Sequence, residues 1–274
     1  MTPVELHHGA ATDVGLLRET NEDAFLVAPP VFVVADGMGG HESGDVASRI
    51  VVEEFARLAD AGYDPTAGDV AVRDALEASQ HRITEYAAAG DGIRGGGPRR
   101  TPGTTVVAAL LVESEGAPAW LLVNLGDSRI YALSGGVLRQ VSTDHSVVQE
   151  LIDAGQITES EAARHPERHV ITRALGGPRL EPADYFVVPV REVERLLLCS
   201  DGISGLIGDA QIAEVLAGPP DPGAAADALV AAALAAGGED NATAVVVDVV
   251  GLVPDEDDDS ERQRASLEQL GALP

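Results

Sequence analysis

The sequence contains no lysine, because all 18 of its basic residues are arginines. Without a lysine amine the chain cannot form a Schiff base, and it cannot build a phosphate-binding P-loop, whose motif requires lysine. Aromatic residues make up only 3% of the chain, and Cys199 is its single cysteine. One cysteine excludes an internal disulfide and a zinc site made from several cysteines.

The sequence also lacks long apolar runs and any excess of positive charge. No run reaches about 18 apolar residues, the length that a membrane span needs. The N-terminus has no basic segment followed by an apolar stretch, which is the pattern of a secretory signal. Acids outnumber bases 45 to 18, and the net charge of −27 repels phosphate backbones and anionic lipids. We therefore expect a cytoplasmic protein that binds neither nucleic acid nor membrane.

The length and composition predict one folded domain and a tail. With 274 residues, 45% of them apolar, the chain is long enough for a substantial core. We predict a folded domain over residues 1–251 and an acidic, disordered C-terminal tail over residues 252–274. Seven acids and two arginines between Asp255 and Pro274 give the tail a charge of −5, which leaves −22 on the domain.

Apolar patterns predict the secondary structure. Runs rich in β-branched residues predict strands at residues 31–34, 104–112, 120–123, 196–199 and 243–250. Helical spacing predicts helices at residues 45–59 and 72–86, and shorter ones at 147–154, 210–216 and 227–236. We expect Thr143 or Asp144 to be the N-cap of the 147–154 helix, and residues 90–103 to form a loop. The grouping of the strands favours an α+β fold with antiparallel sheets over a doubly wound sheet.

Several aspartates lie at the ends of these predicted strands. Asp36 and Asp201 follow two strands and each precedes a glycine, Asp127 follows a third, and Asp240 precedes a fourth. In an antiparallel sheet such ends lie side by side, so the acids can meet at one edge. Clustered carboxylates repel one another unless a cation lies among them, and all-oxygen ligands favour Mg²⁺ or Mn²⁺. The alternative stays open, because any single Asp-Gly pair is more often a turn.

Eight short motifs occur in an order and at separations that resemble a known family. They are RETNED from Arg18, DGMGGH from Asp36, GTT from Gly103, GDSR from Gly126, TDHS from Thr143, RALG from Arg173, SDG from Ser200 and DN from Asp240. Together they resemble the metal-dependent protein phosphatases, the type 2C serine/threonine phosphatases, over about residues 13–250. The DGMGGH form is typical of bacterial members, and the lysine-free, alanine-rich composition indicates a bacterium with a GC-rich genome.

The resemblance implies a fold and a reaction. The expected fold is a sandwich of two antiparallel β-sheets flanked by α-helices, with a dinuclear metal site at one end. The expected activity is hydrolysis of phosphoserine and phosphothreonine in proteins by a metal-activated water, without a phosphoenzyme. The implied cofactors are two Mg²⁺ or Mn²⁺ ions, with a third ion in bacterial members. The implied partners are phosphorylated proteins and a serine/threonine kinase that the enzyme opposes, and we expect a monomer.

The resemblance also implies metal ligands. Asp36 corresponds to the carboxylate that bridges both ions, and Gly37 to the residue that lends a backbone carbonyl. Asp201 and Asp240 correspond to ligands of the first ion. Glu22 corresponds to a carboxylate that contacts the second ion through water.

Four further positions correspond to supporting roles. Asp127, together with Asp201, matches a weaker third-ion site. Arg18 matches the arginine that holds the substrate phosphate, a task that suits its planar two-donor fork. Asp23 and Asn241 are expected to support the ligands from behind.

The proton donor and the substrate-selecting segment are less defined by the resemblance. Eukaryotic relatives carry a histidine, proposed as the general acid, where this chain has Met38. His41 is a candidate donor, with a purely structural role as the alternative. Residues 155–170 correspond to the variable flap beside the site, where Arg164 and Arg168 are candidates for shaping substrate choice, as are Glu159 and Glu161.

Three other functions are alternatives to a type 2C phosphatase. A pseudophosphatase that acts as a protein-binding regulatory module is the main alternative, and loss of a core ligand would be its sign. A phosphatase of anti-sigma-factor antagonists normally carries sensor domains. An acidic cation buffer predicts many weak sites and no turnover.

Overall fold

The computed structural model describes residues 4–39, 43–89 and 101–252. His41, most of the predicted 90–103 loop and the predicted tail beyond Leu252 lie outside the described residues. Within the described part of the chain, no helix is long and apolar enough to cross a membrane.

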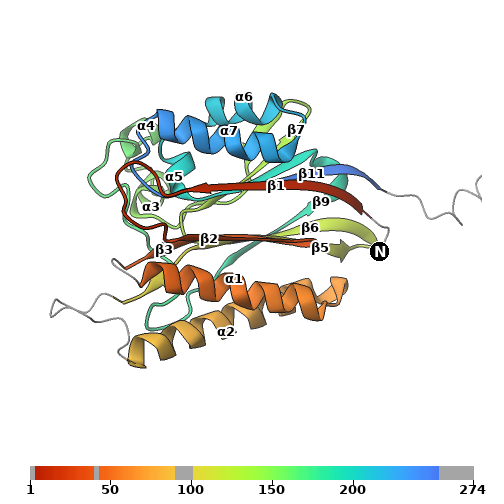
Figure 1. The fold of residues 1–274 in the computed structure, drawn as a ribbon, viewed down its shortest axis with the longest axis horizontal. Coiled ribbons are helices and arrows are strands. Elements are labelled where there is room, and N and C mark those ends of the chain that lie inside the picture. Colours follow the sequence, from red (N-terminus) through yellow and green to blue (C-terminus); the bar gives the residue numbers. More distant parts are fainter. Residues whose placement is uncertain (1–3, 40–42, 90–100, 253–274) are drawn as a thin grey trace, which may run out of the picture.

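Two antiparallel sheets form the centre of the molecule (Figure 1). The strand order of the first sheet is β1 (Val4–Asp13), β11 (Ala242–Leu252), β10 (Arg195–Cys199), β7 (Arg129–Ser134) and β8 (Val137–Gln140). The order of the second is β2 (Asp23–Ala28), β3 (Val31–Met38), β5 (Val106–Ser114), β6 (Ala117–Leu125) and β9 (Asp184–Pro189), and β4 (Gly103–Thr104) pairs with β3. This arrangement confirms the expected sandwich of two antiparallel sheets.

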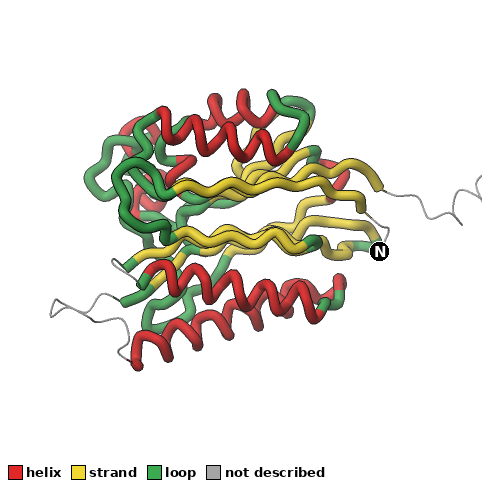
Figure 2. The backbone as a smooth tube through the Cα atoms, viewed as in Figure 1, coloured by secondary structure: helices red, strands yellow, loops and turns green. Residues whose placement is uncertain are grey.

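Helices cover both outer faces of the sandwich (Figure 2). The second sheet is covered by α1 (Gly44–Ala61) and α2 (Gly68–Ala89), which are joined by the short 3₁₀ helix η1 (Pro65–Ala67). The first sheet is covered by α6 (Asp209–Ala217) and α7 (Pro222–Ala235). Three short helices, α3 (Val147–Asp153), α4 (Glu159–Ala162) and α5 (Asp201–Ser204), lie near one end of the sandwich, and η2 (Val190–Glu192) precedes β10.

The strands alternate between apolar layers, as the period of two requires. In β3, Val31, Val33 and Ala35 pack against the helices α1 and α2. Phe32 and Val34 face the other way, into the layer between the two sheets. Because both faces are covered, the run from Val31 to Ala35 is continuously apolar rather than alternating with polar residues.

The predicted helices are present with shifted ends, and one predicted cap is wrong. The last helix begins at Pro222, because Asp221 caps it by accepting the Ala224 N–H. The N-cap of α3 is Ser146, whose hydroxyl accepts the Gln149 N–H, rather than Thr143 or Asp144. Asp144 is instead engaged by Arg129.

Candidate metal centre

A pocket of about 530 Å³ lies at the end of the sandwich where β3 ends and α5 begins. Its walls come from the segment before β2, the end of β3, the turn after β6, the flap, α5 and the start of β11. The acids that line it are Glu22, Asp36, Asp127, Asp201, Glu239 and Asp240. Thus residues separated by more than 200 positions in the chain meet here, as the strand-end argument predicts.

The GTT motif holds Asp36 in place through its backbone. The Asp36 N–H donates to the Thr105 hydroxyl at 3.1 Å, and the Asp36 carbonyl accepts from the Thr105 N–H at 2.9 Å. The Thr104 hydroxyl also donates to that carbonyl at 2.9 Å. These bonds fix the Asp36 backbone in the strand, so the position of its side chain in the pocket is set by β3.

The glycines after Asp36 and Asp201 are required by close packing. A Cβ on Gly37 would lie 2.3 Å from the Gly44 carbonyl oxygen. A Cβ on Gly202 would lie 1.8 Å from the Asn241 carbonyl oxygen, which is far inside van der Waals contact. Each glycine lets a second backbone segment approach the aspartate, so both Asp-Gly pairs serve the pocket rather than a surface turn.

Asn241 ties the arginine-bearing segment to the start of β11. Its amide donates to the carbonyls of Val14 and Thr20 at 2.9 Å each, and its Oδ1 accepts the Glu22 N–H at 2.8 Å. Arg18 lies on this tied segment and donates to Asp240 Oδ2 at 2.6 Å. Asn241 thereby fixes the position of Glu22 relative to Asp240.

The carboxylates strain one another electrostatically. Burial, followed by the charges of neighbouring aspartates, raises the pKa of Asp36 well above its usual value. Burial and then the charge of Asp201 raise the pKa of Asp127 to about 8. Burial and then the charge of Asp240 raise the pKa of Asp201. Buried carboxylates that repel one another in this way are stabilised when a cation lies among them.

Asp23 does not line the pocket but lies beside Asp36 in the sheet. It pairs with Asp36 across β2 and β3, and its Oδ2 accepts from the hydroxyls of Ser200 and Thr243 at 2.7 and 2.6 Å. Burial raises the pKa of Asp23 to about 7 in spite of these two donors. Its Oδ1 and the Oδ1 of Asp127 are buried without a hydrogen-bond partner.

This donor set fits hard divalent cations. The orphaned carboxylate oxygens and the raised pKa values mark a site where a cation would replace missing hydrogen-bond donors and protons. In the described residues, no three His, Cys, Asp or Glu side chains enclose a single ion by themselves. The acids instead surround the pocket, which suits Mg²⁺ or Mn²⁺, ions that complete their coordination with water and carbonyl oxygens.

The remaining predicted residues divide into those in the pocket and those outside it. Arg18, Gly37 and Asn241 line the pocket, as does Met38. His41 lies outside the described residues, so its role stays a prediction. Arg129 and Arg173, which the motifs contain, form internal ion pairs with Asp144 and Asp184.

Sequence reasoning missed several lining residues. His169, Ile171 and Leu206 line the pocket together with Glu239. Glu239 directly precedes a predicted ligand, which was a usable signal. His169 comes from the flap, Ile171 directly follows the flap, and Leu206 lies beyond α5. No local pattern separates these three from ordinary surface residues.

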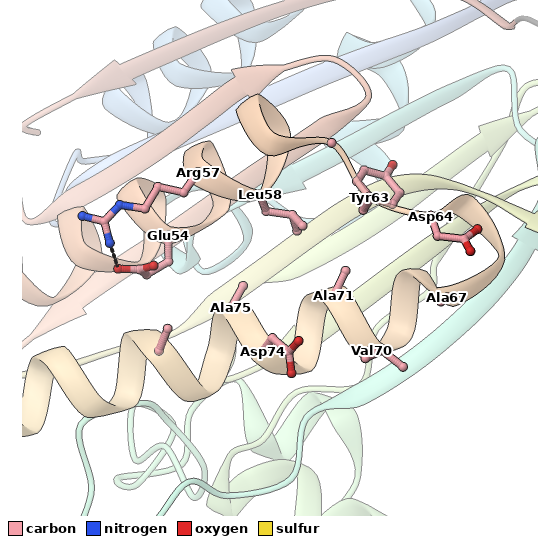
Figure 3. Close-up of a pocket in the computed structure, with 12 residues that line it drawn as sticks. Glu54, Arg57, Leu58, Tyr63, Asp64, Ala67, Val70, Ala71, Asp74 and Ala75 are labelled. Carbon is pink, nitrogen blue, oxygen red and sulfur yellow. Dashed lines mark hydrogen bonds and ion pairs between the residues drawn. The ribbon is translucent and has the colours of Figure 1, made fainter.

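A second hollow, of about 460 Å³, lies between α1 and α2 (Figure 3). Four alanines are among its lining residues, and Glu54, which also lines it, is paired with Arg57 at 2.5 Å. Because its one buried acid is already neutralised, this hollow lacks the strained carboxylates of the first pocket.

Comparisons with known proteins identify the family of this chain. The model of the family described as protein phosphatase 2C matches residues 18–236. The serine/threonine phosphatase stp of Listeria monocytogenes is 37% identical over 222 residues, which cover 77% of this chain and 83% of that protein. The serine/threonine protein phosphatase PstP of Mycobacterium tuberculosis is 38% identical over 247 residues, which cover 89% of this chain and 45% of that protein.

Solved structures of bacterial serine/threonine phosphatases have a similar fold. The crystal structure of Mycobacterium tuberculosis PstP/Ppp superposes with a TM-score of 0.77 at 37% identity, covering 89% of this chain and 98% of that one. The catalytic domain of PstP in complex with two manganese ions superposes with a TM-score of 0.75 at 36% identity, covering 90% and 99%.

Proposed function

The chain belongs to the protein phosphatase 2C family and is a metal-dependent serine/threonine protein phosphatase, and from this premise we propose how its pocket acts. The observation that carries the proposal is the gathering of six acids and Arg18 from distant segments around one pocket. The relatives that are named as phosphatases give no support to the pseudophosphatase alternative.

We assign the metal ions to the acids that the motifs predicted. Asp36, Asp201 and Asp240 would hold them, with the Gly37 carbonyl and Glu22 completing the site. Asp127 would contribute to a third position, since its Oδ1 is buried and unpartnered. When bound, two such ions polarise the phosphate and lower the pKa of a water enough to make it a nucleophile near neutral pH.

The protein's own part is binding and positioning. Arg18 lines the pocket and donates to Asp240, so it can hold the phosphate oxygens while the acids hold their cations. Asn241 keeps the Arg18 segment in register with Asp240, and Thr105 keeps Asp36 rigid. Such positioning carries most of the work in phosphoryl transfer, because little covalent chemistry falls to the protein. Met38 lines the pocket and has no proton to give to the leaving oxygen.

The cellular setting is inferred from composition and family. Phosphorylated proteins are the substrates, and we place the enzyme opposite a serine/threonine kinase of the same cell. The net charge of −27 supports a cytoplasmic monomer that avoids nucleic acids and membrane surfaces.

One experiment tests the function. The purified chain is incubated with phosphoserine and phosphothreonine peptides, with Mn²⁺ and then with an excess of chelator, and released phosphate is measured. We expect turnover with Mn²⁺ and none with chelator. Cleavage without metal would refute the two-ion site, and peptide binding without any turnover would support the pseudophosphatase instead.

A further inference from the structure

The flap places two basic side chains, Arg168 and His169, at the wall of the acidic pocket. Both residues are exposed. Neither was a predicted ligand or phosphate-binding residue. Arg168 adds a positive charge to a pocket that six acids line.

Arg168 differs from Arg18 in what already holds it. Arg18 is bonded to Asp240 at 2.6 Å. Within residues 4–39, 43–89 and 101–252, no carboxylate pairs with the Arg168 guanidinium, although acids outnumber bases 45 to 18 in the chain. Among the described residues, Arg168 is thus a pocket cation without a carboxylate partner, which makes it available to an outside anion.

The backbone around Arg168 is held by consecutive turns. The Arg168 N–H donates to the His165 carbonyl at 3.2 Å, and the Val170 N–H donates to the Glu167 carbonyl at 3.0 Å. The segment is then anchored to α3, because the Val147 N–H donates to the Val170 carbonyl at 2.9 Å. The backbone that carries Arg168 is therefore held in place beside the pocket.

We propose that Arg168 binds an acidic side chain next to the phosphorylated residue, so that this enzyme favours phosphoproteins with Asp or Glu beside the phosphoserine or phosphothreonine. The inference rests on the proposed function and narrows its substrate class. Arg18, which the charges of Asp240, Glu22 and Asp36 surround, lies on the side of the predicted ions and suits the phosphate itself. Arg168 is exposed on the flap, where the residues flanking the phosphate would pass.

The charges around the pocket make the contribution of Arg168 easy to detect. Glu22 and Glu239 line the same pocket and the chain carries a charge of −27, so both repel an acidic peptide. An unpaired cation such as Arg168 offsets that repulsion for an acidic flank that faces it. Without the Arg168 charge, peptides with acidic flanks should change from favoured to disfavoured substrates. This change in relative kcat/KM should be larger than the one caused by loss of a single contact in a neutral protein.

The test compares matched phosphothreonine peptides with alanine, glutamate or arginine flanks, at saturating Mn²⁺ and low salt. The wild type, Arg168→Gln, Arg168→Glu and the control Arg164→Gln are assayed for kcat/KM on each peptide. Arg164 is a suitable control because it is an exposed flap arginine that does not line the pocket. The readout is the ratio of kcat/KM between flanks within each variant, so that a general loss of activity cancels.

We expect the wild type to favour glutamate over alanine flanks by about fivefold, equivalent to about 1 kcal/mol for an exposed ion pair. Arg168→Gln should abolish the ratio, Arg168→Glu should shift it toward arginine flanks, and Arg164→Gln should keep it. A wild type without the preference, or a ratio that survives in Arg168→Gln, would overturn the inference. So would an equal loss on all flanks, because Arg168 would then bind the phosphate. A wild type inactive on every peptide would instead overturn the proposed function, and this inference with it.

Discussion

Phe32 and Trp120 lie between the two sheets with no exposed surface, and their rings meet edge to face at 6.1 Å. A few residues further along β3, Asp36 is enclosed among other carboxylates. The same strand therefore carries both an apolar interior and an acidic pocket. In the first region, burial lowers the free energy of the folded state by about 1.5–3 kcal/mol per large side chain. In the second, burial raises it, because charges lose water and repel one another.

The difference separates what folds this protein from what it does. The apolar layers stabilise the folded state. The strands that they hold in place position the aspartates at one end of the sandwich, although burial there is energetically unfavourable for these side chains. Carboxylates that are buried, orphaned and mutually repelling persist where a function needs them. Changes in the pocket should therefore affect activity far more than stability, and changes in the layers should do the reverse.

Asp201→Asn should produce the largest effect. It keeps the shape of the side chain but removes one charge from the predicted cation site, so kcat/KM should fall at least about a thousandfold, or about 4 kcal/mol. In metal-free protein, the urea midpoint should stay equal or rise, because a repelling charge is gone. Phosphate release and urea titration measure the two quantities. A variant with near-normal kcat would show that Asp201 is not a ligand.

The strand ends of the pocket could be predicted because local and global patterns agree there. The apolar run from Val31 to Ala35 predicts a buried strand, and the pair Asp36 and Gly37 indicates where that strand ends. The grouping of such runs favours antiparallel sheets, while the two-sheet sandwich comes from the resemblance to the type 2C phosphatases. The strand-end positions of Asp36, Asp201 and Asp240 make a common site possible, and the resemblance makes these residues metal ligands.

Other parts depend on contacts that leave no local trace. β1 was missed because His7, His8 and Gly9 interrupt its apolar residues, and its strand character comes from pairing with β11. The role of Asn241 depends on carbonyls at Val14 and Thr20, more than 200 residues away. The charge pattern of the flap likewise acquires meaning only when the fold places it at the pocket.

Phe32→Ala should give the next largest effect. In contrast to Asp201→Asn, it should lower stability and leave activity unchanged. The change leaves a cavity beside Trp120, so the free energy of unfolding should fall by about 3–5 kcal/mol. The folded fraction should keep its kcat, because Phe32 does not line the pocket. Urea unfolding followed by circular dichroism measures the loss, with Val137→Ala as an exposed control. A selective loss of kcat would mean that the two regions are coupled.

The pH dependence of the metal-free protein should show the strain of the pocket directly. The folded protein raises the pKa of Asp127 to about 8 and that of Asp23 to about 7, from an ordinary value of 3.8. The folded state thus holds protons that the unfolded chain releases, so stability falls as pH rises from about 4 to about 8. We expect a loss of several kcal/mol, because the two buried carboxyl groups bind their protons far more tightly in the folded state than in the unfolded chain.

Asp127→Asn separates this effect from the general repulsion of a chain with a charge of −27. The variant should show a flatter decline of the urea midpoint with pH than the wild type, and saturating Mn²⁺ should flatten the wild type as well. A metal-free stability that rises across this interval would show that the carboxylates are not strained by burial.

Arg18→Ala should have the smallest effect, because Arg18 stands at the border between the pocket and solvent. Its side chain is half exposed and already shares one donor with Asp240, so the phosphate gains only part of a charged hydrogen-bond pair. We expect KM to rise about tenfold, or about 1.4 kcal/mol, with a smaller change in kcat and no change in the urea midpoint. Arg73→Ala, which removes an equally exposed arginine from an ion pair on α2, should leave KM unchanged. If Arg18→Ala lowered stability without raising KM, Arg18 would act as a structural partner of Asp240. Arg18 would then belong with the residues that stabilise the fold and not with those that bind the substrate, although it lines the pocket.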